Sequence, residues 1–242
     1  LLEAQDQARE AAIHQERVKL IADFLYSASH EFRTPLSIIQ TSLYLIDRAP
    51  EPAQRQRHLA KADEPIDRIN RLVDMLLLLA KLDAITELIQ QPVQISTLVQ
   101  QMIQQWQRGF DEHGIAITVD LQAELPRIQG HASYLLQAFE QIIDNALKNM
   151  GEGDQLTICG RHDPSRAEVV ISIADTGAGI EAKDLSQVFQ RFWRKDDSHT
   201  TPGFGLGMPI AQRIITLHGG TITLDSEVGV GTTVTIGLPI GD

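Results

Sequence analysis

The sequence has little of what marks several large classes of protein. It contains a single cysteine, Cys159, in 242 residues, which excludes an internal disulfide and fits a reducing compartment. No apolar run approaches the ~18 residues that a membrane-spanning helix needs, and no signal-peptide pattern opens the chain. Basic residues number 21 against 32 acidic ones, a formal charge of −11, so a nucleic-acid surface is not expected.

The residues that are present support real hydrophobic cores. Hydrophobic residues make up 43% of the chain, and its length allows one or two domains. Because the hydrophobic pattern changes after about residue 88, we expect two domains. The chain opens within a helical pattern and without an initiating methionine, so we expect a soluble piece of a longer protein.

The first 48 residues show the spacing of a coiled-coil helix. Counting in sevens gives an unbroken apolar series: Ala4, Ala11, Val18, Leu25, Phe32, Ile39 and Ile46. His30 lies two residues before Phe32, roughly 160° around the helix at about 100° per residue. The spacing therefore predicts that the imidazole of His30 faces solvent, next to the carboxylate of Glu31. Pro35 is expected to bend the helix one turn later.

Simpler interpretations of His30 have to be considered. A single histidine on a polar helix face is most often solvated surface. The sequence His30-Glu31 also occurs in zinc proteases, where a second histidine four residues later completes a metal pair. That position is Thr34 in this chain, so the zinc interpretation is poor.

A second helix is predicted from about residue 53 to 85, after a turn at Ala49 to Pro52. Its apolar positions are spaced 3-4-3-4 along the helix: Ile66, Ile69, Val73, Leu76 and Ala80. Two helices joined by a short turn form an antiparallel hairpin, which cannot bury both apolar series by itself. A dimeric four-helix bundle would bury them. The alternative is a hairpin that folds onto the next domain.

The remainder reads as an α+β sandwich, because helices alternate with short strands of an antiparallel or mixed sheet. Helices are expected at about 96–113, with Ser96 as a plausible N-cap, at 131–150 and at 206–218. Strands are expected at about 92–95, 115–121, 126–130, 155–162, 167–174, 221–225 and 232–238.

The helix at 131–150 carries polar groups that fit a nucleotide and a metal. Asn145 and Lys148 are three residues apart and share a face. An amide oxygen suits Mg²⁺, which keeps waters and substrate phosphates as its other ligands, and a lysine can meet those phosphates. By itself this pattern is weak, because polar residues are common on helix surfaces.

Two glycine-containing segments follow. Asp175 ends a hydrophobic strand and opens DTGAGI, where a carboxylate suits a base with an exocyclic amine and glycines allow close approach to the backbone. GFGLGMPI begins at Gly203 and leads into a helix, whose first N–H groups suit a triphosphate. Its spacing matches neither the dinucleotide fingerprint nor a P-loop, and protein-kinase motifs are absent.

Between the two glycine-containing segments, VFQRFWR at 188–194 offers two arginines near phosphates. The polar stretch at 195–201 is typical of a flexible lid.

In this order, these segments resemble the boxes of sensor histidine kinases. HEFRTPL at 30–36 resembles the phospho-acceptor box and the segment around Asn145 the N box. DTGAGI, VFQRFWR and GFGLGMPI resemble the first glycine, F and second glycine boxes. The resemblance covers nearly the whole chain. It departs at Gln141, where the family often has a further asparagine.

The resemblance implies a multidomain fold: an all-α antiparallel hairpin, paired as a four-helix bundle in a dimer, then an α+β two-layer sandwich of GHKL type. The expected domains are a signalling coiled-coil helix at 1–22, a dimerisation and phospho-acceptor domain at 23–88, and an ATP-binding catalytic domain at 89–242.

The implied activity is that of a protein-histidine kinase in two-component signal transduction. His30 is autophosphorylated from ATP and Mg²⁺ and passes the phosphoryl group to an aspartate of a response regulator receiver domain. Glu31 is the candidate proton acceptor, and Thr34 resembles a position that helps regulator dephosphorylation. The implied metal ligand is Asn145, with Gln141 as a second candidate. The implied ATP-binding residues are Asn145, Lys148, Asp175, Gly177, Gly179, Ile180, Phe189, Arg191, Phe192, Gly203, Gly205, Leu206 and Gly207.

We further expect a homodimer in the cytoplasm that meets the membrane only through N-terminal regions outside this sequence, and no nucleic-acid partner. Two alternatives belong to other classes. One is a GHKL ATPase of the chaperone or mismatch-repair type, which leaves His30 unexplained. The other is a non-catalytic dimeric scaffold with a degenerate nucleotide site. Retention of γ-phosphate label on the protein discriminates both from a histidine kinase.

Overall fold

The computed structural model describes residues 2–195 and 203–241, with side chains described from Gln15 onward except at 16, 17 and 20. Its compact units are Leu1–Leu76 and Leu77–Asp242. The boundary falls inside a helix, so the last two turns of that helix belong to the second unit.

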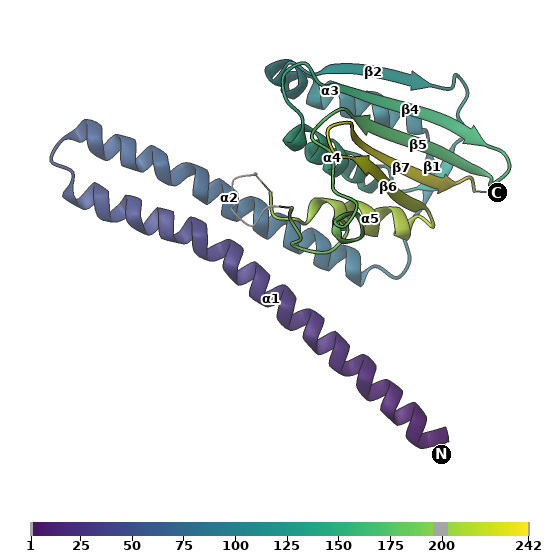
Figure 1. Ribbon diagram of the computed structural model, residues 1–242, viewed down its shortest axis with the longest axis horizontal. Coiled ribbons are helices and arrows are strands. Elements are labelled where there is room, and N and C mark those ends of the chain that lie inside the picture. The colour runs from purple at the N-terminus through teal and green to yellow at the C-terminus, as the bar shows by residue number, and fades with distance from the viewer. Residues whose placement is uncertain (1, 196–202, 242) are drawn as a thin grey trace. The chain divides into compact units, whose positions relative to one another are not determined.

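The first unit is the predicted helical hairpin (Figure 1). It is formed by α1 (Leu2–Arg48) and by α2 (Pro52–Ala84), of which all but the last turns belong to this unit. The helix α1 runs uninterrupted through Pro35, and α2 through Pro65. Both prolines are buried. Within the part of the chain that is described, no helix is long and apolar enough to cross a membrane.

The residues buried between the two helices are mostly small. On α1 they recur every seven residues at Ala28, Pro35 and Ser42, and Ala49 follows directly after the helix. Small side chains let the two backbones approach closely. The larger residues of the predicted apolar series lie off this line, and Val18 and Leu25 are 54% and 57% exposed. Phe32, Ile39 and Ile46 are half-buried, so the single hairpin covers this series only in part.

The second unit is built on a mixed five-stranded sheet with strand order β2-β4-β5-β7-β6. These strands are β2 (Ala116–Leu121), β4 (Gln155–Asp163), β5 (Glu168–Asp175), β6 (Thr221–Glu227) and β7 (Gly231–Pro239). Only β2 and β4 are parallel among these neighbours. A separate antiparallel pair joins β1 (Gln91–Val93) to β3 (Ile128–Gly130).

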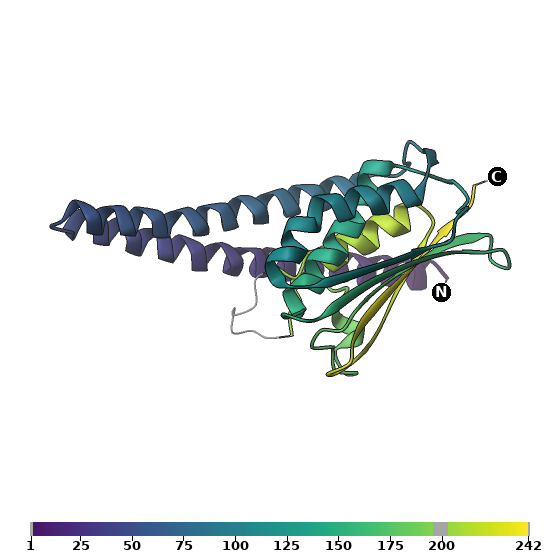
Figure 2. The ribbon, with the colours of Figure 1, turned by 90° about the horizontal axis from the view of Figure 1, so that it is seen from above.

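Three helices cover one face of the sheet (Figure 2). They are α3 (Ile95–His113), α4 (Ala132–Asn149) and α5 (Gly207–Leu217), with a short 3-10 helix, η1, at Leu185–Gln187. Strand β5 alternates buried and half-buried residues, so one face packs on the helices. Fully buried side chains of this core include Phe110 and Phe139. This is the predicted two-layer α+β arrangement.

One local prediction is wrong. The expected N-cap Ser96 already lies inside α3, which begins at Ile95 with Gln94 at the cap position. The Gln94 side chain does not cap the helix but donates to the carbonyl of Leu125 at 3.0 Å. Tertiary contact therefore decides the start of α3. Its end is as predicted, at Gly114 in the left-handed conformation (φ 65°).

Candidate functional site

His30 lies on the solvent-exposed side of α1, as the helical spacing predicts. The fourth residue after it, Thr34, is half-buried, and the buried Pro35 follows. The helix α1 continues without interruption through Pro35, so His30 lies on a continuous helical surface. The imidazole can therefore be reached from solvent.

Glu31, the next residue, points toward α2. Its side chain is 10% exposed, and Oε2 lies 3.1 Å from Nη2 of Arg68 on α2. A carboxylate this buried needs a charged or hydrogen-bonding partner, and Arg68 supplies one. The candidate proton acceptor is thus tied to the interior of the hairpin.

In the second unit, α4 presents a polar stripe to the second glycine segment. A Cβ on Gly207 would lie 2.9 Å from Oε1 of Gln141, and a Cβ on Gly203 would lie 3.7 Å from Nζ of Lys148. Lys148 also pairs with Asp144 on its own helix. Asn145, half-buried, lies between Gln141 and Lys148 on this stripe. The structure therefore brings together the amide, ammonium and glycine backbone groups that the sequence singled out.

The first glycine segment is held against the end of α4. The N–H of Ala178 donates to the carbonyl of Asn149 at 3.0 Å. A Cβ on Gly177 would collide with this same carbonyl, and one on Gly179 (φ 69°) would collide with the carbonyl of Glu227. Close backbone approach thus requires glycine at both positions. The next residue, Ile180, donates its N–H to Oγ of Ser226 at 2.8 Å.

Asp175 is half-buried at the end of β5, and its carboxylate is fixed by backbone donors. Oδ1 accepts from the N–H of Gly177 at 2.9 Å and of Thr232 at 3.3 Å. Burial raises the pKa of this carboxyl above its usual range, more than the two hydrogen bonds lower it, and nearby Asp154 raises the pKa further. A carboxyl held this way can accept a hydrogen bond from a ligand at a defined position.

The segment around Phe192 crosses to the second glycine segment. Phe192 has φ 65°, uncommon for a non-glycine residue, and its N–H donates to the carbonyl of Gly205 at 2.9 Å. Nη2 of Arg191 lies 2.7 Å from Oδ2 of Asp83 on the last turn of α2. Phe189 is half-buried. Leu206 is fully buried at the start of α5, and Pro209 fits in the first turn as expected.

Comparison with known proteins identifies both parts of the chain. Residues 20–85 match the His Kinase A (phospho-acceptor) domain. Residues 130–242 match the family described as histidine kinase-, DNA gyrase B- and HSP90-like ATPase. The two occur in the order of the predicted hairpin and sandwich.

The chain belongs to the sensor histidine kinases.

Sensor protein SrrB of Staphylococcus aureus (strain N315) is 35% identical to this histidine kinase over 223 residues, which is 90% of this chain and 38% of SrrB. The chain thus spans about two fifths of the length of the curated relatives it matches. A crystal structure of full-length ShkA in complex with AMPPNP aligns with a TM-score of 0.68 at 28% identity, covering 90% of this chain and 45% of ShkA.

Two more distant structures show the same fold. Histidine kinase AdeS of Acinetobacter baumannii aligns with a TM-score of 0.69 at 21% identity, over 88% of this chain and 98% of AdeS. Histidine kinase ThkA, in a crystal structure with the response regulator protein TrrA, aligns with a TM-score of 0.76 at 17% identity, over 94% of this chain and 64% of that one.

Sequence reasoning missed several residues of this histidine kinase that hold the candidate site in place. Thr232 and Ser226 hydrogen-bond the first glycine segment, and Asp83 pairs with Arg191. Arg213 on α5 also approaches Asp83. No local sequence signal marks them, because each lies at least 45 residues from the group it contacts. The predicted lid at 195–201 falls, apart from Lys195, outside the described residues; Nζ of Lys195 donates to the carbonyl of Gly179 at 3.3 Å.

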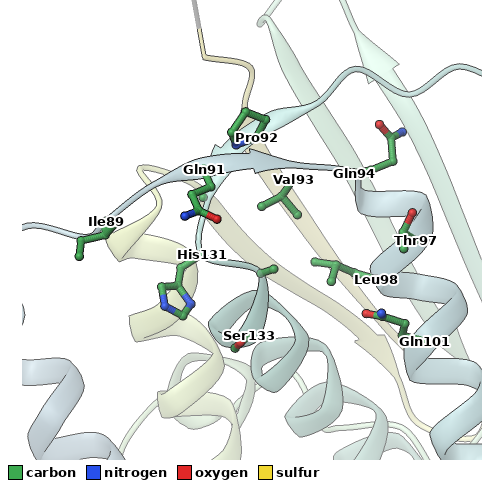
Figure 3. Close-up of a pocket in the computed structure, with 12 residues that line it drawn as sticks. Ile89, Gln91, Pro92, Val93, Gln94, Thr97, Leu98, Gln101, His131 and Ser133 are labelled. Carbon is green, nitrogen blue, oxygen red and sulfur yellow. The ribbon is translucent and has the colours of Figure 1, made fainter.

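The histidine kinase also has a cavity of about 430 Å³ at the starts of α3 and α4 (Figure 3). Its lining combines amide and hydroxyl side chains with apolar ones, including His131 at the N-cap of α4 and Ser133 in its first turn. It includes none of the predicted ATP-binding residues, so it is separate from the glycine segments.

Proposed function

We propose that this chain binds ATP on the stripe of α4 and transfers its γ-phosphoryl group to His30. The observation that carries the proposal is the convergence of both glycine segments on α4. Gly203 and Gly207 approach Lys148 and Gln141, while Gly177 packs on the carbonyl of Asn149. Asp175 would accept a hydrogen bond from the adenine amine at one end of this surface. The N–H groups at the start of α5 and the Lys148 ammonium would meet the phosphates at the other.

The transfer step at His30 is a displacement at phosphorus. One imidazole nitrogen attacks the γ-phosphorus as the bond to the bridging oxygen of ADP breaks, and ADP leaves. The attacking nitrogen bonds through its lone pair, which makes the ring cationic, and Glu31 accepts the proton that the other ring nitrogen then loses. Because Glu31 is held by Arg68 within the hairpin, its carboxylate has a fixed position relative to the backbone of His30.

The residues of the stripe fit a magnesium ion. No group of three or more His, Cys, Asp and Glu side chains among the described residues is placed to hold a metal. Mg²⁺ in nucleotide sites takes few protein ligands and completes its shell with waters and phosphates, so the amide oxygens of Asn145 and Gln141 suffice. When bound, the ion supplies neutralisation of the phosphate charge.

The further steps follow from the family. ThkA has been crystallised with a response regulator, and we propose that this chain likewise passes its phosphoryl group to an aspartate of a receiver domain docked near His30. Thr34 would orient the water that dephosphorylates the regulator. The exposed apolar residues of α1 and α2 support a homodimer through the hairpin. We place this assembly in the cytoplasm as the output part of a larger sensor.

The test of the proposal is incubation of the wild type and of His30→Gln with γ-labelled ATP. We expect label on the wild type that is acid-labile and alkali-stable, as a phosphoramidate is, and none on His30→Gln. Both proteins should bind ATP with equal affinity. ATP hydrolysis without retained label would indicate instead an ATPase that uses nucleotide as a conformational clamp. Absence of ATP binding would indicate a scaffold with a degenerate site.

A further inference from the structure

Within the second unit, the end of α2 is held by two arginines. Arg213 on α5 donates to the carbonyl of Leu82 from Nε at 3.2 Å and from Nη2 at 3.1 Å, and to the carbonyl of Ile85 at 3.4 Å. Carbonyls at a helix C-terminus have no partner within the helix, and a cation there is favoured by the helix dipole. Leu82 is fully buried beside this contact. Arg213 therefore caps α2 from another element.

Asp83 lies between the two arginines. Its Oδ1 is 3.7 Å from Nε of Arg213, and its Oδ2 is 2.7 Å from Nη2 of Arg191. Because Arg213 fixes the backbone on either side of Asp83, the carboxylate is held where it meets Arg191. Asp83 thus determines the position of the Arg191 guanidinium.

Arg191 is joined to the second glycine segment through the residue that follows it. The N–H of Phe192, the next residue, donates to the carbonyl of Gly205, two residues before the start of α5. A guanidinium at this place adds positive charge next to the backbone that would take the triphosphate. The Asp83 carboxylate compensates this charge at a distance of 2.7 Å.

We propose that Asp83 is a positioning residue that competes with the phosphates of ATP for Arg191. The inference rests on the proposed function, since it needs a triphosphate at the second glycine segment. Whenever the phosphates draw Arg191 toward them, the contact with Asp83 weakens, and by linkage it weakens by the same factor by which this contact lowers ATP affinity. The last turn of α2 is then coupled to the phosphates of the nucleotide.

The experiment compares equilibrium binding of ATP and of adenosine to the full chain at low salt. Asp83→Asn should bind ATP roughly two- to fivefold more tightly than the wild type, the range expected when a partly exposed ion pair no longer competes. Adenosine affinity should not change, because Arg191 acts on phosphates only. Asp83→Glu, which keeps the carboxylate, should stay near the wild type.

Two controls test whether the change in ATP affinity comes from the Asp83–Arg191 pair. Glu87→Gln removes the same charge from the exposed connector after α2 and should change neither affinity. In the background of Arg191→Met, adding Asp83→Asn should have no effect on ATP affinity.

Equal or weaker ATP binding by Asp83→Asn overturns the inference, as does a parallel change in adenosine binding, and either result leaves the proposed kinase intact. Failure of the wild type to bind ATP removes both.

Discussion

The carboxylate of Glu31 lies 3.1 Å from the guanidinium of Arg68, so the neighbour of the predicted nucleophile is anchored across the helical hairpin. Glu31→Gln should slow autophosphorylation by roughly 100-fold, since a positioned base contributes on that order, without changing ATP affinity. Rapid-quench assays with labelled ATP measure both quantities. An unchanged rate would remove Glu31 from the proton transfer.

Arg68→Met should loosen the hairpin. It leaves the Glu31 carboxylate without its arginine partner in a mostly buried position, at a cost of about 1–3 kcal/mol. Hydrogen exchange of α1 and α2 amides should then speed up. Arg71→Met, one turn along α2 at an exposed position, is the matched control and should have little effect. Equal protection of these amides from hydrogen exchange in both variants would contradict a structural role for the Glu31–Arg68 pair.

Asp175→Asn should separate ligand binding from stability. ATP affinity should fall by roughly tenfold or more, because the amide presents a weaker acceptor to the adenine amine. The raised pKa of Asp175 means that the folded state holds its proton more tightly than the unfolded state does. The wild type is therefore penalised as pH rises through that pKa, and Asp175→Asn should be at least as stable at pH 7. This advantage should vanish below about pH 4, where both states are protonated. Thermal unfolding from pH 3 to 8 tests the sign.

Gly179→Ala should disrupt the first glycine segment. The position has φ 69°, and an added Cβ would collide with the carbonyl of Glu227. Gly153→Ala is a matched control, because it also has positive φ (89°) but nothing within 4 Å of the new Cβ. Both variants carry the left-handed strain of about 1–2 kcal/mol. Only Gly179→Ala should lose substantially more stability and lose ATP binding. Similar unfolding midpoints for the two variants would show that the first glycine segment can rearrange to accommodate the added Cβ.

Thr34→Ala should abolish dephosphorylation of the regulator while sparing autophosphorylation. Thr34 is half-buried one turn after His30, where its hydroxyl could orient water but does not contact the phosphoryl donor in the proposed kinase step. The measurement is loss of label from the phosphorylated regulator with and without each variant. Unchanged dephosphorylation would refute the assignment.

Leu43→Glu combined with Leu59→Glu should give a monomer. These side chains are 57% and 58% exposed on the single hairpin, one on each helix, and a dimer interface would have to cover such apolar surface. Sedimentation equilibrium measures the change. Gln40→Glu, an exposed polar position on α1, should remain dimeric. A double variant that still dimerises would show that the dimer interface lies on another surface.

Local pattern predicted most elements because their signals are local. The helices end where Gly114 and Gly219-Gly220 allow the chain to turn, and the strand that ends at Asp175 is marked by its hydrophobic run. Ser96 shows where local reasoning fails. It is a good N-cap residue by type, but the chain enters α3 from Gln94, whose side chain is engaged by Leu125, 31 residues away.

The apolar series of α1 is a more informative case. Counting in sevens correctly indicated a long helix, but within the single hairpin the fully covered positions of α1 include a second series of small residues, Ala28, Pro35 and Ser42. Hydrophobicity scales rank leucine and isoleucine above alanine and serine, so the pattern marked the series that the single hairpin covers only in part. Close packing of two helices favoured the small residues.

The sequence by itself determined the order and type of most elements and the exposure of His30, because each depends on residues within one or two turns of each other. Only the tertiary structure decided that Glu31 is held by Arg68, that Thr232 supports Asp175, and that Asp83 meets Arg191 across 108 residues of chain. These pairs form because the packed elements bring distant side chains together, and the spacing of residues along a single chain carries no record of that distance in space.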